Sequence, residues 1–322
     1  MLHTAACDIL GIRHPVCQAG MADYTSPELV AAVSRAGGLG VHGTLGRGAA
    51  ELTRLFRDTR ALLNGEPFGA NLVIDRTDEA IFDLCLAERV PVLALSWGDP
   101  GPWTAKARAA GTIVLHQVTT AAEVSLALAA GVDLLIAQGT EAGGHSGFVP
   151  LAALLPAVVA AAGTTPVLAA GGIADGRGLA AALALGAAGA WIGTRFLATP
   201  EARASAAWKA ALVAAGAGDT VHTRAFDTLW GTPWPNAAVR ALANDFTAAW
   251  HGREAALLAR HDTVQRTVWQ AERDDDPRLL SLMAGTGVGA IAAIQPAADV
   301  VAALVTDAVA SIARLGALVR QD

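Results

Sequence analysis

Aromatic residues and charges are both scarce in this chain of 322 residues. Phe, Trp and Tyr together make up 5% of the sequence, with a single tyrosine, and charged residues make up only 16%. Hydrophobic residues reach 53%, which argues against disorder because such a chain can bury a large core. The net charge is −6, and no basic cluster occurs. We therefore expect no nucleic-acid partner, since such binding needs a basic face.

Cysteine is also rare, and several functional signatures are missing. Cys7, Cys17 and Cys85 lack CxxC spacing, and a sparse, odd count is typical of the reducing cytoplasm. No signal peptide is evident, and prolines and glycines interrupt the uncharged stretch 146–174, so we expect no membrane span. The sequence contains no HExxH, GxSxG or Walker pattern and no grouping with metal-ligand spacing, so we predict no metal.

Short, continuous apolar runs recur along the first two thirds of the chain, and each is followed by a helical pattern. Parallel strands that are buried on both faces have this appearance. Strict alternation of strand and helix indicates either a barrel or a large open sheet, and a count of eight favours a (β/α)8 TIM barrel. The predicted strands are residues 15–21, 39–43, 68–73, 90–97, 112–118, 133–139, 166–172 and 190–198.

The pattern changes after about residue 200. Residues 201–278 are rich in tryptophan and have a helical pattern, so we expect a helical subdomain that covers the mouth of the barrel. The alternative is that this region forms a surface for a homodimer. In either case, residues 1–200 and 279–322 would make up the barrel itself.

The motif that most strongly indicates chemistry directly follows the sixth predicted strand. Active sites of barrels lie on the loops after the strands, and a polar Gln138 at the strand end can reach a ligand there. Gly143 and Gly144 lack side chains, so their backbone can approach a planar ring closely. His145 can act as a base or as a hydrogen-bond donor near neutral pH. The alternative is a glycine-rich loop with a surface histidine.

Two further glycine motifs end the seventh and eighth strands. Gly171 and Gly172 form the first, and the second is the run Trp191-Ile192-Gly193-Thr194. The loops after strands seven and eight of barrels commonly bind phosphate through backbone N–H groups. We therefore predict a phosphate site here, with a further hydrogen bond from the threonine hydroxyl. The alternative is that these glycines only permit tight packing.

Polar or flexible groups also occur near the ends of the first and third strands. Asn71 lies in an apolar strand and must find hydrogen-bond partners if it is buried. The edge of a heterocycle would supply such partners, whereas the alternative is a structural amide. The run Gln18-Ala19-Gly20-Met21 offers backbone groups and a soft side chain that can lie against a flat ring.

These motifs, in this order, resemble the nitronate monooxygenase family, formerly called 2-nitropropane dioxygenases. The resemblance covers most of the barrel and the closing helix but little of residues 200–280. It implies an FMN enzyme that oxidises alkyl nitronates, such as propionate 3-nitronate, with O2 to a carbonyl compound and nitrite. The matching stretches are residues 15–21, 26–40, 68–72, 138–147, 166–197 and 283–298.

The resemblance also implies roles for single residues. FMN would lie at the carboxyl ends of the strands, and His145 would be the active-site histidine beside the flavin and the substrate. Asn71 and Gln138 would bond the isoalloxazine or ribityl parts, while Gly143 and the backbone of residues 18–21 would lie near the ring. The phosphate would be held by Gly172, Gly193 and Thr194.

The sequence departs from the family pattern in places that bear on the substrate. Many relatives have Ala-Pro-Met where this chain has Ala19-Gly20-Met21, and some line the pocket with several tyrosines. Another FMN reaction therefore stays open, either an NAD(P)H-dependent enoyl reductase or a biosynthetic flavin oxygenase. A third alternative is a barrel that binds a flavin or phosphate without catalysis.

Overall fold

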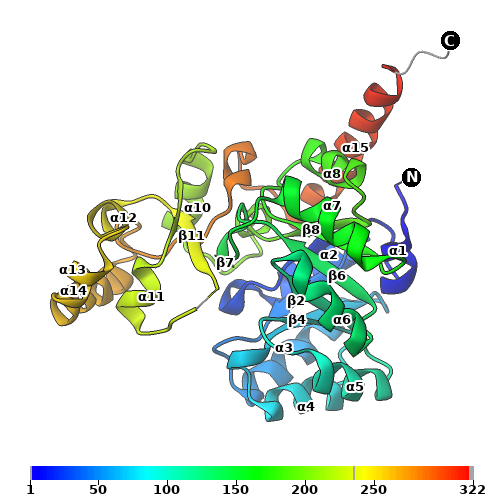
Figure 1. The fold of residues 1–322 in the computed structure, drawn as a ribbon, viewed down its shortest axis with the longest axis horizontal. Helices are drawn as coiled ribbons and strands as arrows, with labels where there is room; N and C mark the ends of the chain where they lie inside the picture. The colour runs from blue at the N-terminus through cyan, green and yellow to red at the C-terminus, as the bar shows by residue number, and fades with distance from the viewer. Residues whose placement is uncertain (1, 235, 319–322) are drawn as a thin grey trace.

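The computed structural model describes residues 2–234 and 236–318, and its centre is a parallel barrel of eight strands (Figure 1). The strands follow the order β1-β9-β8-β6-β5-β4-β3-β2, and a bridge between Cys17 and Leu39 brings the first strand beside the second. The predicted TIM barrel is confirmed. Its strands are β1 (Val16–Gln18), β2 (Gly40–Gly43), β3 (Phe68–Val73), β4 (Val92–Ser96), β5 (Ile113–Val118), β6 (Leu134–Gln138), β8 (Val167–Ala170) and β9 (Gly189–Ile192).

Helices surround the barrel, as Figure 1 shows. The long helix α15, from Ala297 to Gly316, packs on α8 and α2 and so returns the chain to the barrel. Short 3-10 turns η1 (Ala22–Tyr24), η2 (Ile74–Arg76), η3 (Ala121–Glu123) and η4 (Thr286–Ala290) connect elements. The other helices here are α1 (Ala5–Leu10), α2 (Pro27–Arg35), α3 (Ala49–Leu62), α4 (Glu79–Ala87), α5 (Gly101–Ala109), α6 (Val124–Ala130), α7 (Leu151–Ala162), α8 (Gly176–Ala184) and α9 (Thr194–Leu197).

Side-chain capping explains where several of these helices begin. The hydroxyl of Ser26 accepts a hydrogen bond from the N–H of Leu29, and Asp175 accepts one from Gly178. Glu123 instead reaches back to accept from the N–H of Thr119, at 2.8 Å. The first two caps each satisfy a backbone donor that the first turn of a helix leaves unpaired.

The barrel strands are buried on both faces, and alternate side chains point to opposite sides. Val92 and Ala94 of β4 belong to the apolar cluster that fills the barrel. Leu93 and Leu95, the residues between and after them, belong to the larger cluster between strands and helices. Trp191 of β9 is 6% exposed and packs in the inner cluster, so it helps to fill the barrel.

The region 201–278 contains strands as well as helices. It contains two strands, β10 (Thr220–Thr223) and β11 (Ala238–Leu242), and β11 pairs antiparallel with β7 (Gly144–Ser146) from the loop after β6. These strands are short and only partly apolar, so no clear alternation marks them. The helices are α10 (Ala206–Ala214), α11 (Ala225–Trp230), α12 (Asp245–Trp250), α13 (Glu254–Leu258) and α14 (His261–Asp274).

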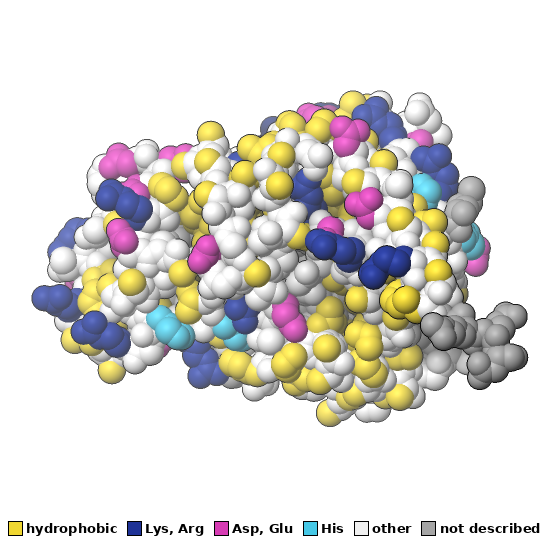
Figure 2. Space-filling view, turned by 90° about the horizontal axis from the view of Figure 1, so that it is seen from above, with side chains coloured by type: hydrophobic (Ala, Val, Ile, Leu, Met, Phe, Trp, Pro, Cys, Tyr) yellow, Lys and Arg dark blue, Asp and Glu magenta, His cyan; other side chains and the backbone are white. Residues whose placement is uncertain are grey.

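The surface carries charges of both signs, and they are intermixed on the face drawn in Figure 2. Within residues 2–234 and 236–318, no helix combines the length and the apolar character needed to cross a bilayer.

Candidate active site

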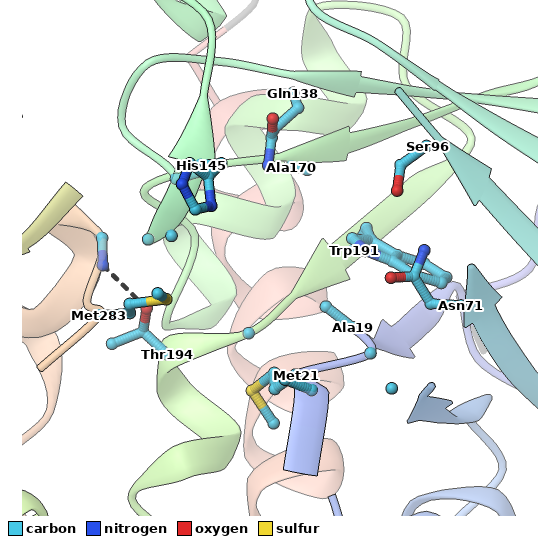
Figure 3. A pocket seen from close by; sticks show the side chains of 18 of the residues that line it. Ala19, Met21, Asn71, Ser96, Gln138, His145, Ala170, Trp191, Thr194 and Met283 are labelled. Atoms are coloured by element: carbon cyan, nitrogen blue, oxygen red, sulfur yellow. Dashed lines mark hydrogen bonds between the residues drawn. The ribbon is translucent and has the colours of Figure 1, made fainter. Parts of the chain in front are cut away.

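A cavity of about 420 Å³ opens at the carboxyl ends of the barrel strands (Figure 3). Loops from widely separated parts of the sequence meet around it, as expected for a barrel. The structure thus brings together all but one of the residues that the sequence singles out. They are Ala19, Gly20, Met21, Asn71, Gln138, Gly143, Gly144, His145, Gly171, Gly172, Trp191, Ile192, Gly193 and Thr194.

Gln18, whose backbone the resemblance places near the ring, is the exception. Its side chain is fully buried between two strands and does not line the cavity. The amide oxygen accepts from the N–H of Val41 at 3.1 Å, and the amide nitrogen donates to the carbonyl of the same residue at 3.2 Å. Gln18 therefore joins β1 to β2 where the barrel closes.

His145 lies in β7 and projects into the cavity wall (Figure 3). Its Nε2 is 2.8 Å from Oδ1 of Asp227, and the two side chains are only 18% and 9% exposed. The ring also stacks on the indole of Trp234, with centroids 4.0 Å apart and planes 20° apart. Two contacts from the region 201–278 thus fix the orientation of this imidazole.

Neither of these partners was found from the sequence. Asp227 lies 82 residues after His145, and no local spacing connects them. Trp234 belongs to the tryptophan-rich stretch that the sequence does mark, but only the antiparallel pairing of β7 with β11 brings that stretch to the histidine.

Two amides face the cavity from barrel strands, and each keeps one polar atom free. Asn71 donates from Nδ2 to the carbonyl of Ala94 at 2.9 Å, and Gln138 accepts from Gln117 at 3.1 Å. Among the described residues, Oδ1 of Asn71 and Nε2 of Gln138 have no partner. One free acceptor and one free donor therefore remain for a bound heterocycle.

Unpaired backbone donors gather on the opposite side of the cavity. No residue that the structure describes accepts a hydrogen bond from the N–H of Gly172, Gly193 or Thr194. The hydroxyl of Thr194 accepts from the N–H of Gly285 at 2.9 Å, which leaves its own hydrogen free (Figure 3). Converging N–H groups of this kind suit an anionic group such as phosphate.

The glycines at the cavity serve different purposes. A Cβ at Gly143 would lie 2.7 Å from the backbone nitrogen of Gly285, and one at Gly20 would lie 2.5 Å from Cβ of Asn71. Glycine at these two positions therefore permits close packing, against backbone at Gly143 and against the Asn71 side chain at Gly20. At Gly193, by contrast, the nearest protein atom to an added Cβ is 3.7 Å away. The free space at Gly193 is thus available to a ligand.

Three tryptophans form much of the remaining wall. Trp97 follows β4 and meets Trp234 edge to face at 5.3 Å, while Trp208 of α10 packs edge to face on Tyr24. Trp97 has a backbone φ of 54°, which is unusual for a bulky residue and is typical of constrained sites.

The other histidines near the barrel lie in supporting positions. His42 is fully buried, and its Nε2 contacts the hydroxyl of Thr59 at 2.7 Å. Burial lowers its pKa to about 3, so it stays neutral. His222 contacts the hydroxyl of Ser146 and the carbonyl of Ala238, and burial lowers its pKa as well. Those contacts link β10 to the β7–β11 pair.

A second cavity, of about 370 Å³, lies on the other side of the Trp97–Trp234 pair. Both tryptophans and Gln117 line the two cavities, so the cavities adjoin each other. His116 and Arg76 line only the outer one. The guanidinium of Arg76 lies 4.5 Å from the ring centroid of Trp234 and donates to the carbonyl of Pro233 at 2.6 Å.

A barrel with a deep cavity, a buried His–carboxylate pair and unpaired backbone donors at the strand ends has the architecture of a TIM-barrel enzyme. The model of the nitronate monooxygenase family matches residues 3–83 and 80–307 of the chain. The chain therefore belongs to the nitronate monooxygenase family.

Individual relatives extend this finding. A hydroxy-methyl-oxo-octahydroindene-carboxyl-CoA dehydrogenase of Rhodococcus jostii is 40% identical over 70% of this chain and 64% of its own length. The chain thus spans under two thirds of that curated relative. The structure of FabK from Thermotoga maritima has a TM-score of 0.89 at 31% identity, over 99% of this chain and 100% of that one. A nitroalkane oxidase from Streptomyces ansochromogenes has a TM-score of 0.84 at 31% identity, over 97% and 100%.

Proposed function

We propose that this protein is an FMN-dependent monooxygenase that oxidises alkyl nitronates with O2 to a carbonyl compound and nitrite. The observation that carries the proposal is the position of His145. Its imidazole faces the same cavity as the unpaired backbone donors of residues 172, 193 and 194. Family membership supports the reaction class. A small organic substrate and oxygen would be the partners, and the cytoplasm the compartment.

The residues present fit FMN. The free N–H groups of Gly172, Gly193 and Thr194 would hold the phosphate, and Asn71 and Gln138 would bond the polar edge of the ring or the ribityl chain. When bound, the flavin accepts electrons from the substrate and passes them to oxygen. The protein supplies the position and the electrostatic surroundings for that chemistry.

His145 would orient the anionic nitronate or remove the α-proton of a neutral nitroalkane. An ionised carboxylate only accepts hydrogen bonds, so Nε2 carries the hydrogen that it donates to Asp227. Among the described residues, Nδ1 has no partner, and the ring lines the cavity. The lone pair on Nδ1 is therefore the group that would take the α-proton of a neutral nitroalkane, and Nδ1 with that hydrogen on it would donate to an anionic nitronate.

The direct test is nitrite release and oxygen uptake when the purified yellow protein meets alkyl nitronates in air. The same protein should lose its flavin colour when it is mixed with a nitronate without oxygen. A bound flavin that no nitronate changes, in air or without it, would overturn the proposal.

A second candidate is oxidation or reduction of an acyl-thioester substrate with a nicotinamide cofactor. The observation that favours it is the 40% identity to a carboxyl-CoA dehydrogenase. NADH or NADPH should then bleach the flavin within seconds, whereas nitronates should not. Rapid bleaching by nitronates with no response to either nicotinamide excludes this candidate.

A further inference from the structure

The cavity next to His145 has an apolar wall from three distant parts of the chain. Trp234 stacks on the imidazole, and Trp97 meets Trp234 edge to face. Met283, which bridges to Ala241 of β11, comes close to the backbone beside the histidine: a Cβ at Gly144 would lie 3.6 Å from its sulfur. Aliphatic groups of a substrate held by His145 would therefore contact indole rings and a thioether.

We call this part of the inner cavity, with its wall of Trp234, Trp97 and Met283, the tryptophan chamber. The charges of the side chains around it bear on which substrates it accepts. Among the described residues that line the inner cavity there is no lysine or arginine, and the acidic side chain there is the carboxylate of Asp23. A second carboxylate, that of Asp227, lies directly behind the imidazole. An anionic tail on the substrate would thus find no partner of opposite charge, and burying an unpaired carboxylate is costly.

One cation, Arg76, lines the adjoining outer cavity. Arg76 lines the outer cavity and not the inner one, whereas Trp234 lines both. His145 and the guanidinium both contact this indole, at 4.0 and 4.5 Å from a ring centroid. Because Trp234 lines both cavities, while His145 lines only the inner one and Arg76 only the outer one, its indole forms part of the wall between them.

We propose that the enzyme selects nitronates with neutral aliphatic tails and discriminates against those that carry a carboxylate, and that Trp234 determines this specificity. This inference rests on the proposed function and narrows its substrate class. An aliphatic tail gains by leaving water for the tryptophan chamber. A carboxylate tail would need Arg76, and the indole of Trp234 stands between them.

The first experiment compares kcat/KM for two nitronates of the same shape. Propionate 3-nitronate ends in a carboxylate, and the nitronate of 3-methyl-1-nitrobutane has two methyl groups in place of the carboxylate oxygens. We expect the neutral compound to be favoured at least about tenfold. In the series from nitroethane to 1-nitrobutane, kcat/KM should rise about fourfold for each added methylene.

The second experiment removes the indole of Trp234 from the wall between the two cavities. Trp234→Ala should shift the kcat/KM ratio of the two isosteric nitronates at least about tenfold toward propionate 3-nitronate, because the carboxylate can then reach Arg76. The double variant Trp234→Ala/Arg76→Gln should lose that shift. Arg76→Gln alone should leave the kcat/KM ratio as in the unaltered protein. This control distinguishes an effect of removing the indole from an effect of losing one positive charge.

The outcomes distinguish this inference from the function on which it rests. A preference for the neutral compound supports it. Oxidation of propionate 3-nitronate as fast as, or faster than, its neutral isostere would overturn the inference and leave the proposed function intact. An unchanged ratio in Trp234→Ala would overturn the role of Trp234. Oxidation of neither compound would remove the proposed function, and the inference with it.

Discussion

At the scale of single residues, the imidazole of His145 is held more firmly than a loop histidine would be. A carboxylate from α11 bonds one of its nitrogens, and an indole from the segment before β11 covers one of its faces. Such support lowers the number of orientations that the ring can adopt. A base that is already oriented loses less freedom when the substrate binds.

We predict that His145→Ala keeps its flavin but loses about 10²- to 10⁴-fold in kcat/KM for neutral nitroalkanes, whose α-proton needs a base; this is the usual loss on removal of a positioned base. The phosphate donors lie on other loops, so the cofactor should stay bound. Flavin absorbance per protein and nitrite release measure the two effects. His251→Ala, at an exposed histidine after α12, is the matched control and should behave like the unaltered protein. Loss of flavin in His145→Ala would contradict this division of roles.

The carboxylate behind the imidazole provides a second prediction at this scale. Asp227→Asn keeps the shape of the side chain, but its amide can donate to Nε2 and so favour the other tautomer of His145. We expect kcat to fall at least about tenfold, with flavin content and melting temperature nearly unchanged. Steady-state kinetics and a thermal melt suffice for the test. Full activity in this variant would show that the pair has no part in orienting the histidine.

Gly193 is the clearest position at which to test cofactor binding. The protein itself leaves room for a Cβ there, and the backbone is not in the left-handed region. Gly193→Val should therefore fold normally but lose most of its flavin, because the side chain occupies the space of the ligand. Gly172 is less suitable, since its φ of 71° strains any side chain. A Gly193→Val protein with a full complement of flavin would argue against phosphate at this loop.

At the scale of elements, the barrel could be predicted from the sequence because buried parallel strands appear as continuous apolar runs. The caps at Ser26 and Asp175 could be predicted because they depend on residues within one turn of a helix. By contrast, β10 and β11 form an antiparallel sheet with β7, and their pairing joins segments about 95 residues apart. The contacts of His145 depend on that pairing, so no local pattern indicated them.

The loop that carries the histidine depends on one arginine of β11. Nε of Arg240 donates to the carbonyl of Thr140 at 2.6 Å, and its Nη1 donates to the hydroxyl of Thr220 at 3.1 Å. We predict that Arg240→Met, which keeps the apolar stem, speeds hydrogen exchange in residues 139–147 at least about tenfold. Exchange in the strands β3 to β5 should be unchanged. Equal protection of the loop in both proteins would mean that strand pairing alone holds it.

At the scale of the whole molecule, the cavity belongs to both parts of the chain. The barrel provides the backbone donors and the two amides, whereas residues 201–278 provide Trp208, Trp234 and the partner of His145. We propose that residues 1–200 with 279–322 form the FMN-binding unit and that 201–278 form the substrate-side subdomain. Substitutions in the second part should then change substrate choice more than flavin content.

Two buried histidines give the whole barrel a dependence on pH. Burial lowers the pKa of His42 to about 3 and that of His116 to about 4, from an ordinary value of 6.5. Below pH 6.5, His42 and His116 therefore bind protons in the unfolded chain but stay neutral in the folded barrel. The free energy of unfolding must then fall as the pH falls, by about 1.4 kcal/mol per pH unit for each histidine.

We predict a steep loss of stability between pH 6.5 and 5, a window in which exposed carboxylates stay ionised. Urea melts at half-unit intervals measure it. His116→Gln cannot take up the proton, so its stability should fall about half as steeply over the same window. Since Nδ1 of His116 has no partner, the substitution breaks no hydrogen bond at that atom among the described residues. Identical slopes for the two proteins would mean that His116 is protonated in the folded barrel, and the acid sensitivity would then have to arise elsewhere.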